Sequence, residues 1–435
     1  MKKITLAIAV ALGVWGCKNI DDASPSTRGT FIKAYEGPES YEAKAIEKTA
    51  EGYVVVGTMR SANGTLEDTQ TVVFRTDHSG NRIGDVVYFE NLIGNGVKPF
   101  TNTSFSGYII VGDRIKINPT ASQGGNIEIS TMQLLFIDEN LNEVGSYAVN
   151  DPSTDPQRVL TDYSGNAVTV TSDGRVMVLG SYVADGQPKK PFVLSLLNNL
   201  ELEWTNYYNV INLDNINGKS IHYSGGNIIW ASSILSESGN FSDSYITIPF
   251  VKETLSFKNY DALGQEKDHA FFANDITPAR AAGFGFGVVG TFGNRDGSQK
   301  NVFFTTVNTE GDIVKTDTLF IDAVSGVTRS DASQIEDTGD ALAHTSDGGF
   351  IIGGTITTIA GDGGMGNGGR DILLIKIGPF RTIEWIKTIG GSGDETVSAV
   401  READDGGLVI FGTNNIGNYS SIFLIKTNAK GELIK

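Results

Sequence analysis

The sequence is poor in the residue types that most often build covalent or metal-bound sites. Its 435 residues contain one cysteine, which excludes an internal disulfide framework and a cysteine-rich zinc site. The four histidines, His78, His222, His269 and His344, stand far apart and have no partner at metal-ligand spacing. No segment fits an Asp-x-Asp-x-Asp-Gly calcium loop. We therefore expect no metal and no cofactor.

Sequence signatures of catalysis are also missing. No Gly-x-Ser-x-Gly elbow occurs in a strand-to-helix setting. The glycine-rich stretch 361–369 lacks the lysine and the helix that a phosphate site needs. The 51 acidic residues offer many pairs, so glycoside hydrolysis by two carboxylates stays open. We name no catalytic residue.

Basic residues are scarce beside acidic ones. The chain has 34 lysines and arginines against 51 aspartates and glutamates, which gives a formal charge of −17. No local stripe of basic side chains offsets this charge, so the sequence excludes nucleic acid as a partner. A hydrophobic fraction of 40% together with 53 glycines is nevertheless typical of a folded chain.

The one N-terminal apolar run is short. Lys2 and Lys3 precede a run from Ile4 to Gly13, which is half of the roughly 20 residues that a membrane-spanning helix needs. A basic start followed by a short apolar run predicts a secretory signal peptide over residues 1–16. The polar residues that follow, up to residue 28, predict a short tether.

The cysteine stands directly after the apolar run. Cys17 follows Gly16, and this arrangement resembles the lipobox of bacterial lipoproteins. Trp15 departs from that pattern, which prefers a small residue there. The resemblance implies that cleavage leaves Cys17 as a lipidated N-terminal residue, with 17–28 as lipidated cysteine and tether. The alternative is a free cysteine in an ordinary signal peptide.

Seven repeats organise the rest of the chain. Each unit contains a glycine, a short apolar run and a second small residue, as in Gly52-Tyr-Val-Val-Val-Gly57 and Gly407-Leu-Val-Ile-Phe-Gly412. The runs close at positions 57, 112, 180, 231, 290, 354 and 412, a period near sixty. A unit that recurs at a regular spacing indicates a repeat architecture such as a solenoid or a propeller.

Each repeat predicts four strands. A second apolar run, a polar turn and a third run follow the glycine run, and a fainter segment precedes it. Two such faint segments, Thr396–Ala403 and Glu42–Thr49, have residues that favour helix. We assign them to strands because they fall in register with the repeat. Four short strands per unit predict an all-β fold, a seven-bladed β-propeller of four-stranded blades spanning residues 29–435 as a single domain.

The two ends of the chain supply a way to close the ring. The segment from Gly29 to Gly37 matches the outer-strand segment from Ile383 to Gly391, with Phe31 at the place of Trp385. The C-terminus stops where an outer strand should run. We therefore expect the N-terminal strand to join the last blade, which removes an exposed sheet edge.

The last repeats also carry a family resemblance. Glu384-Trp-Ile-Lys-Thr-Ile-Gly-Gly-Ser-Gly-Asp-Glu395, followed by Asp405-Gly-Gly and Gly412-Thr413, resembles the repeat of bacterial secreted β-propellers. With the lipobox, the chain resembles propeller lipoproteins of Bacteroidota. The resemblance implies an exported outer-membrane lipoprotein on the periplasmic or cell-surface side, attached to the membrane through its lipid.

Long loops on one face are the expected binding region. Connections between second and third strands, and between blades, open on the same face of a propeller, and irregular loops on a rigid scaffold often bind ligands. The polar candidates there are Arg114, Arg295, Asp362, Arg370 and Asp394.

Three functions remain open at this point. We expect a membrane-tethered, non-catalytic binding or assembly module with a protein or glycan partner at the loop face. The first alternative is a propeller hydrolase or lyase that acts on glycans with carboxylates on that face. The second is a structural subunit of an outer-membrane complex, which would expose a large apolar patch.

Overall fold

The computed structural model describes residues 29–61, 68–119, 126–149, 162–183, 189–208, 216–224, 227–234, 245–247, 250–252, 257–258, 269–280, 285–294, 298–308, 313–319, 336–358 and 369–434. The predicted signal, Cys17, the tether, Arg295 and Asp362 lie outside these ranges. In the described residues no helix is long and apolar enough to cross a membrane.

The strands of the described residues form seven antiparallel sheets. The first contains β2 (Ser40–Lys48), β3 (Gly52–Arg60), β4 (Gln70–Asp77) and β5 (Arg82–Glu90). The second contains β6 (Leu92–Thr101), β7 (Ser106–Pro119), β8 (Asn126–Asp138) and β9 (Glu143–Ala148). The third contains β10 (Asp162–Val170), β11 (Val176–Val183), β12 (Lys190–Leu196) and β13 (Leu202–Tyr207).

The fourth sheet contains five strands, because two short strands, β16 and β17, both pair with β15. Its members are β14 (Ile216–Ser224), β15 (Asn227–Ile234), β16 (Tyr245–Thr247), β17 (Phe250–Lys252) and β18 (Phe257–Lys258). The fifth contains β19 (His269–Pro278), β20 (Phe286–Asn294), β21 (Asn301–Val307) and β22 (Ile313–Leu319). The sixth contains β23 (Thr338–His344), β24 (Phe350–Thr358), β25 (Gly369–Ile377) and β26 (Ile383–Ile389).

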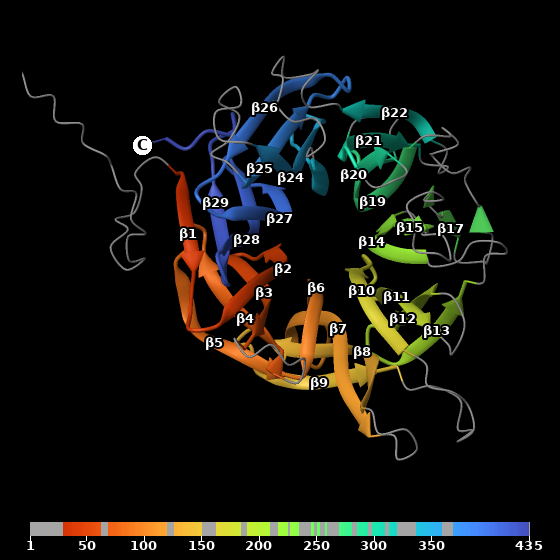
Figure 1. The fold of residues 1–435 in the computed structure, drawn as a ribbon. Coiled ribbons are helices and arrows are strands. Elements are labelled where there is room, and N and C mark those ends of the chain that lie inside the picture. Colours follow the sequence, from red (N-terminus) through yellow and green to blue (C-terminus); the bar gives the residue numbers. More distant parts are fainter. Residues whose placement is uncertain are drawn as a thin grey trace, which may run out of the picture.

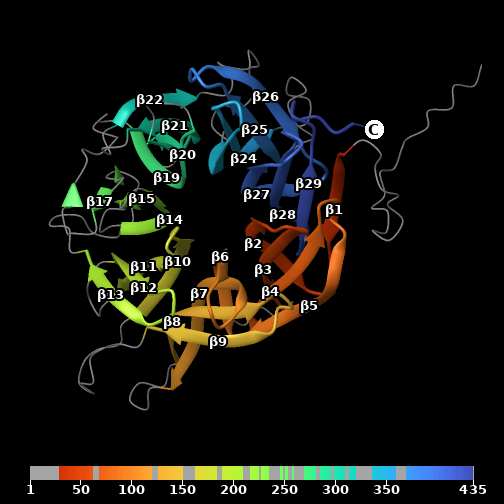
Figure 2. The same cartoon turned by 180° about the vertical axis from the view of Figure 1, so that it is seen from behind.

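The seventh sheet combines the two ends of the chain. It contains β27 (Asp394–Glu402), β28 (Leu408–Ile416), β29 (Tyr419–Lys426) and β1 (Phe31–Tyr35). The sheets surround a central axis in chain order, as Figures 1 and 2 show from the two opposite sides. The protein is therefore an all-β propeller of mostly four-stranded blades. The segments with helix propensity, 42–49 and 396–403, lie in or beside β2 and β27, so their assignment to strands is confirmed.

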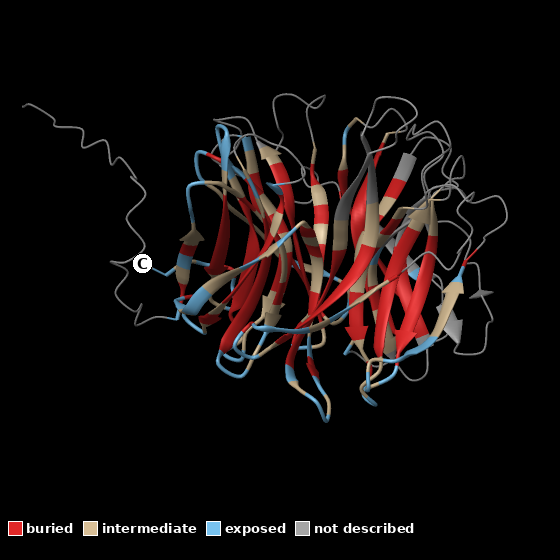
Figure 3. Ribbon diagram, turned by 90° about the horizontal axis from the view of Figure 1, so that it is seen from below, coloured by how far each residue is buried: buried red, intermediate tan, exposed pale blue. Residues whose placement is uncertain are grey.

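The hydrophobic core lies between neighbouring sheets. Val54, Val55 and Val56 of β3 are all fully buried, because the strand is covered on both faces. On one side Val54 and Val56 pack with Val97 and Ile110 of the second sheet. Apolar runs without alternation are thus explained by burial on two faces. Figure 3 shows that buried residues run along the strands and that exposed residues gather at the turns.

The glycine that closes six of the seven apolar runs has a packing role; the fourth run closes with Ala231. A Cβ atom on Gly112 would lie 2.2 Å from the carbonyl oxygen of Ile93, and one on Gly412 would lie 2.0 Å from that of Thr396. Both carbonyls belong to the innermost strand of the same sheet. The repeat keeps glycine there because the inner strand approaches too closely for a side chain.

The N-terminal strand completes the last sheet, as predicted. β1 pairs antiparallel with β29, with Phe31 opposite Lys426 and Tyr35 opposite Ile422. The Thr30 hydroxyl donates a hydrogen bond to the carbonyl of Ile434 at 3.1 Å. The Tyr35 hydroxyl donates to the carbonyl of Gly80 in the first sheet at 2.7 Å. β1 therefore joins the last sheet to the first.

The antiparallel order gives the propeller two different faces. The connections from second to third strand, and from each sheet to the next, emerge at one end, which we call the loop face. The turns from first to second strand and from third to fourth strand emerge at the other end, which we call the turn face. The predicted binding region is the loop face.

Candidate functional site

Each innermost strand carries a β-bulge at the same place. In β6 the pairing with β7 shifts between Gly94 and Gly96, so Asn95 is the extra residue. The other six innermost strands have the same shift, and their extra residues are Lys44, Asn166, Lys219, Asn274, Asp340 and Ser398. A bulge leaves one residue outside the ladder and re-aims its side chain. We call these seven polar residues the bulge ring.

The bulge ring lines a cavity on the axis. All seven residues border a cavity of about 190 Å³. A second cavity, of about 320 Å³, shares Lys219, Asn274 and Asp340 with it. A third, of about 360 Å³, shares Glu47, Lys98 and Arg401 among others. The centre of the propeller is therefore a continuous polar region, which we call the axial cavity.

Three members of the ring connect neighbouring sheets. The Asn95 side-chain amide donates to the carbonyl of Gly165 at 2.9 Å, and that of Asn274 donates to Gly339 at 2.8 Å. The Ser398 hydroxyl donates to the carbonyl of Ala43 at 2.9 Å, from the last sheet to the first. In each case the acceptor directly precedes the bulge of the next sheet. These bonds hold the ring together and fix its side chains.

The charged members of the ring face the axial cavity. Lys219 is exposed to solvent there, although the surrounding protein and the positive charges of Lys189 and Lys44 lower its pKa. Lys44 also lines the cavity, and its ammonium group forms an ion pair of 2.7 Å with Glu42. Repulsion from Lys189 and Lys44 disfavours the charged form of Lys219, but it also shows that several cationic side chains gather here in a chain of charge −17.

The third charged member, Asp340, lies toward the loop face. Its Oδ2 accepts hydrogen bonds from the hydroxyls of Thr338 at 2.7 Å and Thr355 at 3.3 Å. Burial raises the pKa of Asp340 to about 6, although these bonds and the charges of Arg370 and Lys219 act in the opposite direction. Its proton is therefore exchanged close to neutral pH.

The loop-face end of the axial cavity gathers cationic and hydroxyl-bearing residues. We call this end the mouth, and it is lined by Lys219, Asn274, Thr338, Asp340, Thr355, Arg370, Thr396 and Val397. The Arg370 amide donates to Oδ1 of Asp394 at 3.0 Å, and its guanidinium lies 3.9 Å from a carboxylate oxygen of Glu336. The structure therefore brings together two predicted residues, Arg370 and Asp394, and places Arg370 at the mouth.

A group of carboxylates lies beside the mouth. Glu395 is nearly buried, and its Oε2 accepts a hydrogen bond from the Gly391 amide at 3.3 Å. Burial, together with the negative charges of Asp371 and Asp394, raises the pKa of Glu395 to about 7. Among the described residues, no group of three His, Cys, Asp or Glu side chains is arranged to hold a metal ion.

The turn-face end of the axial cavity has a different character. Glu47 forms ion pairs with Lys98 and, at 3.9 Å, with Arg401. Burial lowers the pKa of His222 to about 3, so this imidazole is neutral at physiological pH. Asp275 accepts a hydrogen bond from the Leu342 amide at 2.9 Å. Glu47, Lys98 and Arg401 neutralise one another, so this end resembles a structural polar network.

Of the remaining sequence candidates, the structure describes only Arg114, which does not line this site. Arg114 lies within β7 and not in a loop, because the β7–β8 hairpin is longer than the apolar pattern indicated. Its Nε donates a hydrogen bond to the Gln133 side chain. Arg295, Asp362 and Cys17 lie outside the described residues.

The sequence analysis missed the bulge ring. Its signal is a polar residue between two small ones in five of the seven faint first strands, as in Gly94-Asn95-Gly96 and Gly339-Asp340-Ala341. A single such triplet is common. Its recurrence at one position of five repeats could have identified most of the ring.

No family model matches the sequence, and no curated protein matches it. The fold is similar to solved structures at low sequence identity. The polysaccharide lyase Uly1 aligns with a TM-score of 0.53 and 10% identity over 90% of each chain. A protein of unknown function from Dyadobacter fermentans has a TM-score of 0.49 at 10% identity, over 92% of this chain and 99% of the other. A sialidase of Trypanosoma rangeli has 0.42 at 10% identity, over 89% of this chain and 55% of the other. The likeness to Uly1 shows a shared β-propeller fold.

Proposed function

We propose that the chain is a seven-bladed propeller that works as a non-catalytic binding module and takes an acidic glycan at the mouth. The observation that carries this proposal is the convergence of Lys219 and Arg370 at the mouth, with Lys44 farther along the cavity wall. In a protein of charge −17 a local group of cations focuses the field and attracts anions to one place. The acidic outer surface repels the same ligand elsewhere.

The neutral groups of the mouth suit a ligand rich in hydroxyl groups. Asn274, Thr338, Thr355 and Thr396 offer donors and acceptors around the cations. A polar cavity with few apolar walls matches a hydrated sugar better than an apolar ligand. An acidic sugar combines both requirements, because it carries one carboxylate and several hydroxyls.

The test of the proposal is calorimetric titration of the purified chain with an acidic oligosaccharide, oligogalacturonate, and with its neutral counterpart, galacto-oligosaccharide. We expect binding of the acidic ligand only, weakened by salt because the contacts are ionic. Equal binding of the two, or binding of the neutral one alone, would overturn the assignment of an anionic ligand.

The second candidate function is a glycan hydrolase or lyase. The raised pKa values of Asp340, about 6, and Glu395, about 7, favour it, because a carboxyl group that titrates near neutral pH can act as a general acid or base. Turnover of the acidic oligosaccharide into shorter or unsaturated products, lost in Asp340→Asn, would replace the binding module by this function. Intact oligosaccharide after prolonged incubation would support the binding module.

Ligand affinity should depend on pH through Asp340. Its carboxyl group is charged above pH about 6 and neutral below it, whereas a sugar carboxylate stays ionised at pH 5. Affinity should therefore rise by about threefold to tenfold from pH 7.5 to pH 5, since a nearby negative charge is removed. Calorimetry at both pH values should show this rise. Asp340→Asn should reduce the rise without removing it, because Glu395 beside the mouth also loses its charge over this pH range. An unchanged pH profile in that variant would contradict the role of Asp340.

We also propose that the protein is exported and held at the outer membrane by a lipid on Cys17. The support is the short apolar run after two lysines and the small residue before the cysteine. Cys17→Ala should move most of the protein from the membrane to the soluble fraction, because acyl chains supply the attachment. Fractionation of cells with immunoblotting measures this. Cys17→Ala protein that stays with the membrane would contradict the lipid anchor.

A further inference from the structure

An ion pair recurs at the turn face of the last two sheets. In the sixth sheet, Lys376 of the third strand lies 2.8 Å from Asp347, the aspartate of an Asp-Gly-Gly turn. In the seventh, Lys426 lies 2.5 Å from Asp405 in the same arrangement. Asp347 also accepts a hydrogen bond from the Gly349 amide at 2.9 Å. The pair ties the turn to the third strand.

The first sheet has the same cation but lacks the aspartate. In the strand register, Lys376 lies opposite the residue two positions after Gly349. Lys426 likewise lies opposite the residue two positions after Gly407. In the first sheet the residue two positions after Gly52 is Val54, and Arg75 lies opposite it in the strand register. The aspartate stands two positions before the glycine, and there the first sheet has Ala50. Arg75 therefore occupies the cationic position of the repeat without its acidic partner.

One nitrogen of the half-buried Arg75 guanidinium is left without a partner. Its Nε is buried and has no hydrogen-bond partner among the described residues. Within the same residues, no carboxylate lies within ion-pair distance of it. A buried donor without a partner costs free energy, and a charged one costs more. Arg75 nevertheless borders a cavity and has no carboxylate partner there, so an external anion could take that place by hydrogen bonding to the terminal nitrogens of the guanidinium.

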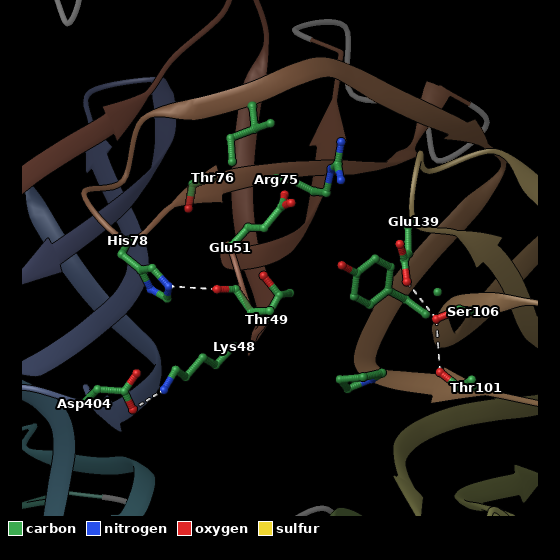
Figure 4. A pocket seen from close by; sticks show the side chains of 15 residues that line it. Lys48, Thr49, Glu51, Arg75, Thr76, His78, Thr101, Ser106, Glu139 and Asp404 are labelled. Atoms are coloured by element: carbon green, nitrogen blue, oxygen red, sulfur yellow. Dashed lines mark hydrogen bonds and ion pairs between the residues drawn. The ribbon is translucent and has the colours of Figure 1, made fainter.

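A cavity of about 610 Å³ opens at this place, between the first and second sheets. It is lined by Arg75 and by Ala50, the residue at the position of the absent aspartate. Figure 4 shows the guanidinium of Arg75 on one side of the cavity, with Ser106 and Thr101 on the other. The volume is within the range of small-molecule sites. We call this cavity the turn-face pocket.

Several groups around Arg75 can bind hydroxyls. The Ser106 hydroxyl donates to Glu139 at 2.7 Å and lies 3.1 Å from the Thr101 hydroxyl. Burial raises the pKa of Tyr108, so its phenol stays protonated and can donate. Glu51 and Glu139 bring negative charge to the pocket, which disfavours a multivalent anion such as phosphate. A single carboxylate is the anion that this pocket tolerates.

We infer that the turn-face pocket is a second binding site, in which the carboxylate of a hydroxycarboxylate, such as one uronic acid unit, takes the place of the absent aspartate on Arg75. The hydroxyl groups of the ligand face Ser106, Thr101 and the carboxylates of the pocket. This site is on the opposite face from the mouth and stands on different residues. It does not depend on the proposed function of the mouth.

The test measures binding of galacturonate by nuclear magnetic resonance in a Lys219→Glu background, which reverses the charge of one of the two cations of the mouth. Acetate and galactose serve as separate probes of the carboxylate and of the hydroxyls. We expect galacturonate to bind with a Kd below about 10 mM, acetate more weakly and galactose not at all. No binding of galacturonate, or equal binding of galactose, would overturn the site.

Two variants separate this site from a general effect on folding. Ala50→Asp restores the aspartate of the repeat, so it should occupy Arg75 from within and weaken galacturonate binding by at least about tenfold. Because it reproduces the ion pair of the sixth and seventh sheets, Ala50→Asp should not lower the unfolding temperature. Arg75→Gln should give the same loss. The matched control, Asp347→Ala, breaks the pair in the sixth sheet and should leave binding unchanged. Full binding in Ala50→Asp would show that the carboxylate sits elsewhere.

Discussion

Deletion of residues 29–35 is expected to lower the unfolding temperature by about 10 °C or more. The deletion removes β1, which is the outermost strand of the last sheet and contacts the first. Without it, β29 becomes an open sheet edge, and such edges pair with other chains. Differential scanning fluorimetry and size-exclusion chromatography measure the two effects, destabilisation and association.

The size of this effect follows from where β1 packs. Phe31 and Tyr35 pack against a core cluster that combines residues of the first and last sheets, such as Phe74 and Phe411. The rings of Tyr35 and Phe74 have centroids 4.7 Å apart. A Cβ atom on Gly80, in the first sheet, would lie 2.7 Å from the Phe31 ring. Loss of the strand therefore uncovers two sheets at once.

A conservative variant in the same strand provides the control. Ile32 points outward and is 56% exposed, so Ile32→Ala should change the unfolding temperature little. A synthetic peptide of residues 29–37, added to the deletion variant, should restore part of the lost stability. A deletion variant as stable and as monomeric as the full chain would show that the ring holds without β1.

The fold could be predicted because the same pattern of apolar runs and turns occurs seven times in the sequence. The glycine that closes most of the apolar runs, such as Gly112, marks the strand that faces the inner one, and its spacing sets the period. The repeat also allowed the first strand of each unit to be assigned as a strand, although the residues of segments 42–49 and 396–403 favour helix when taken alone. The resemblance of Gly29–Gly37 to Ile383–Gly391 was enough to place β1 beside the last strand.

The candidate site was only partly predictable, for physical reasons. Arg370 was found because it follows a long loop, and loops are visible as gaps between apolar runs. Lys219 and Asp340 were missed because a bulge residue is a single position within a strand, and hydrophobic periodicity carries no sign of it. Arg75 was missed for another reason: its importance comes from a partner that is absent, and only the register of three sheets shows which residue that is.

The two faces also differ in how the repeat is used. On the loop face the repeat supplies one polar residue per sheet, and the site arises because these seven residues differ from one another. On the turn face two sheets carry the same ion pair, and the pocket arises where a third sheet has the cation without the aspartate. In both places the closed ring provides rigidity, and departures from the repeat provide specific chemistry.

Reversal of one charge in the bulge ring should abolish binding at the mouth. We expect Lys219→Glu to weaken binding of oligogalacturonate by at least about 100-fold, because it removes a cation and places a carboxylate near Asp340. The fold should persist, since the Lys219 side chain is exposed to solvent inside the axial cavity and is not part of the core. Calorimetry with oligogalacturonate measures the affinity, and circular dichroism measures the fold.

The matched control is Lys430→Glu, which makes the same change of charge on an exposed turn of the turn face. Net charge becomes −19 in both variants, since −17 − 2 = −19. An effect of overall charge would weaken binding equally in both, whereas a local site predicts less than about a threefold change for Lys430→Glu. If Lys219→Glu binds as well as the unchanged chain, the acidic ligand does not use the bulge ring. The mouth would then be an opening of the fold without a role in binding.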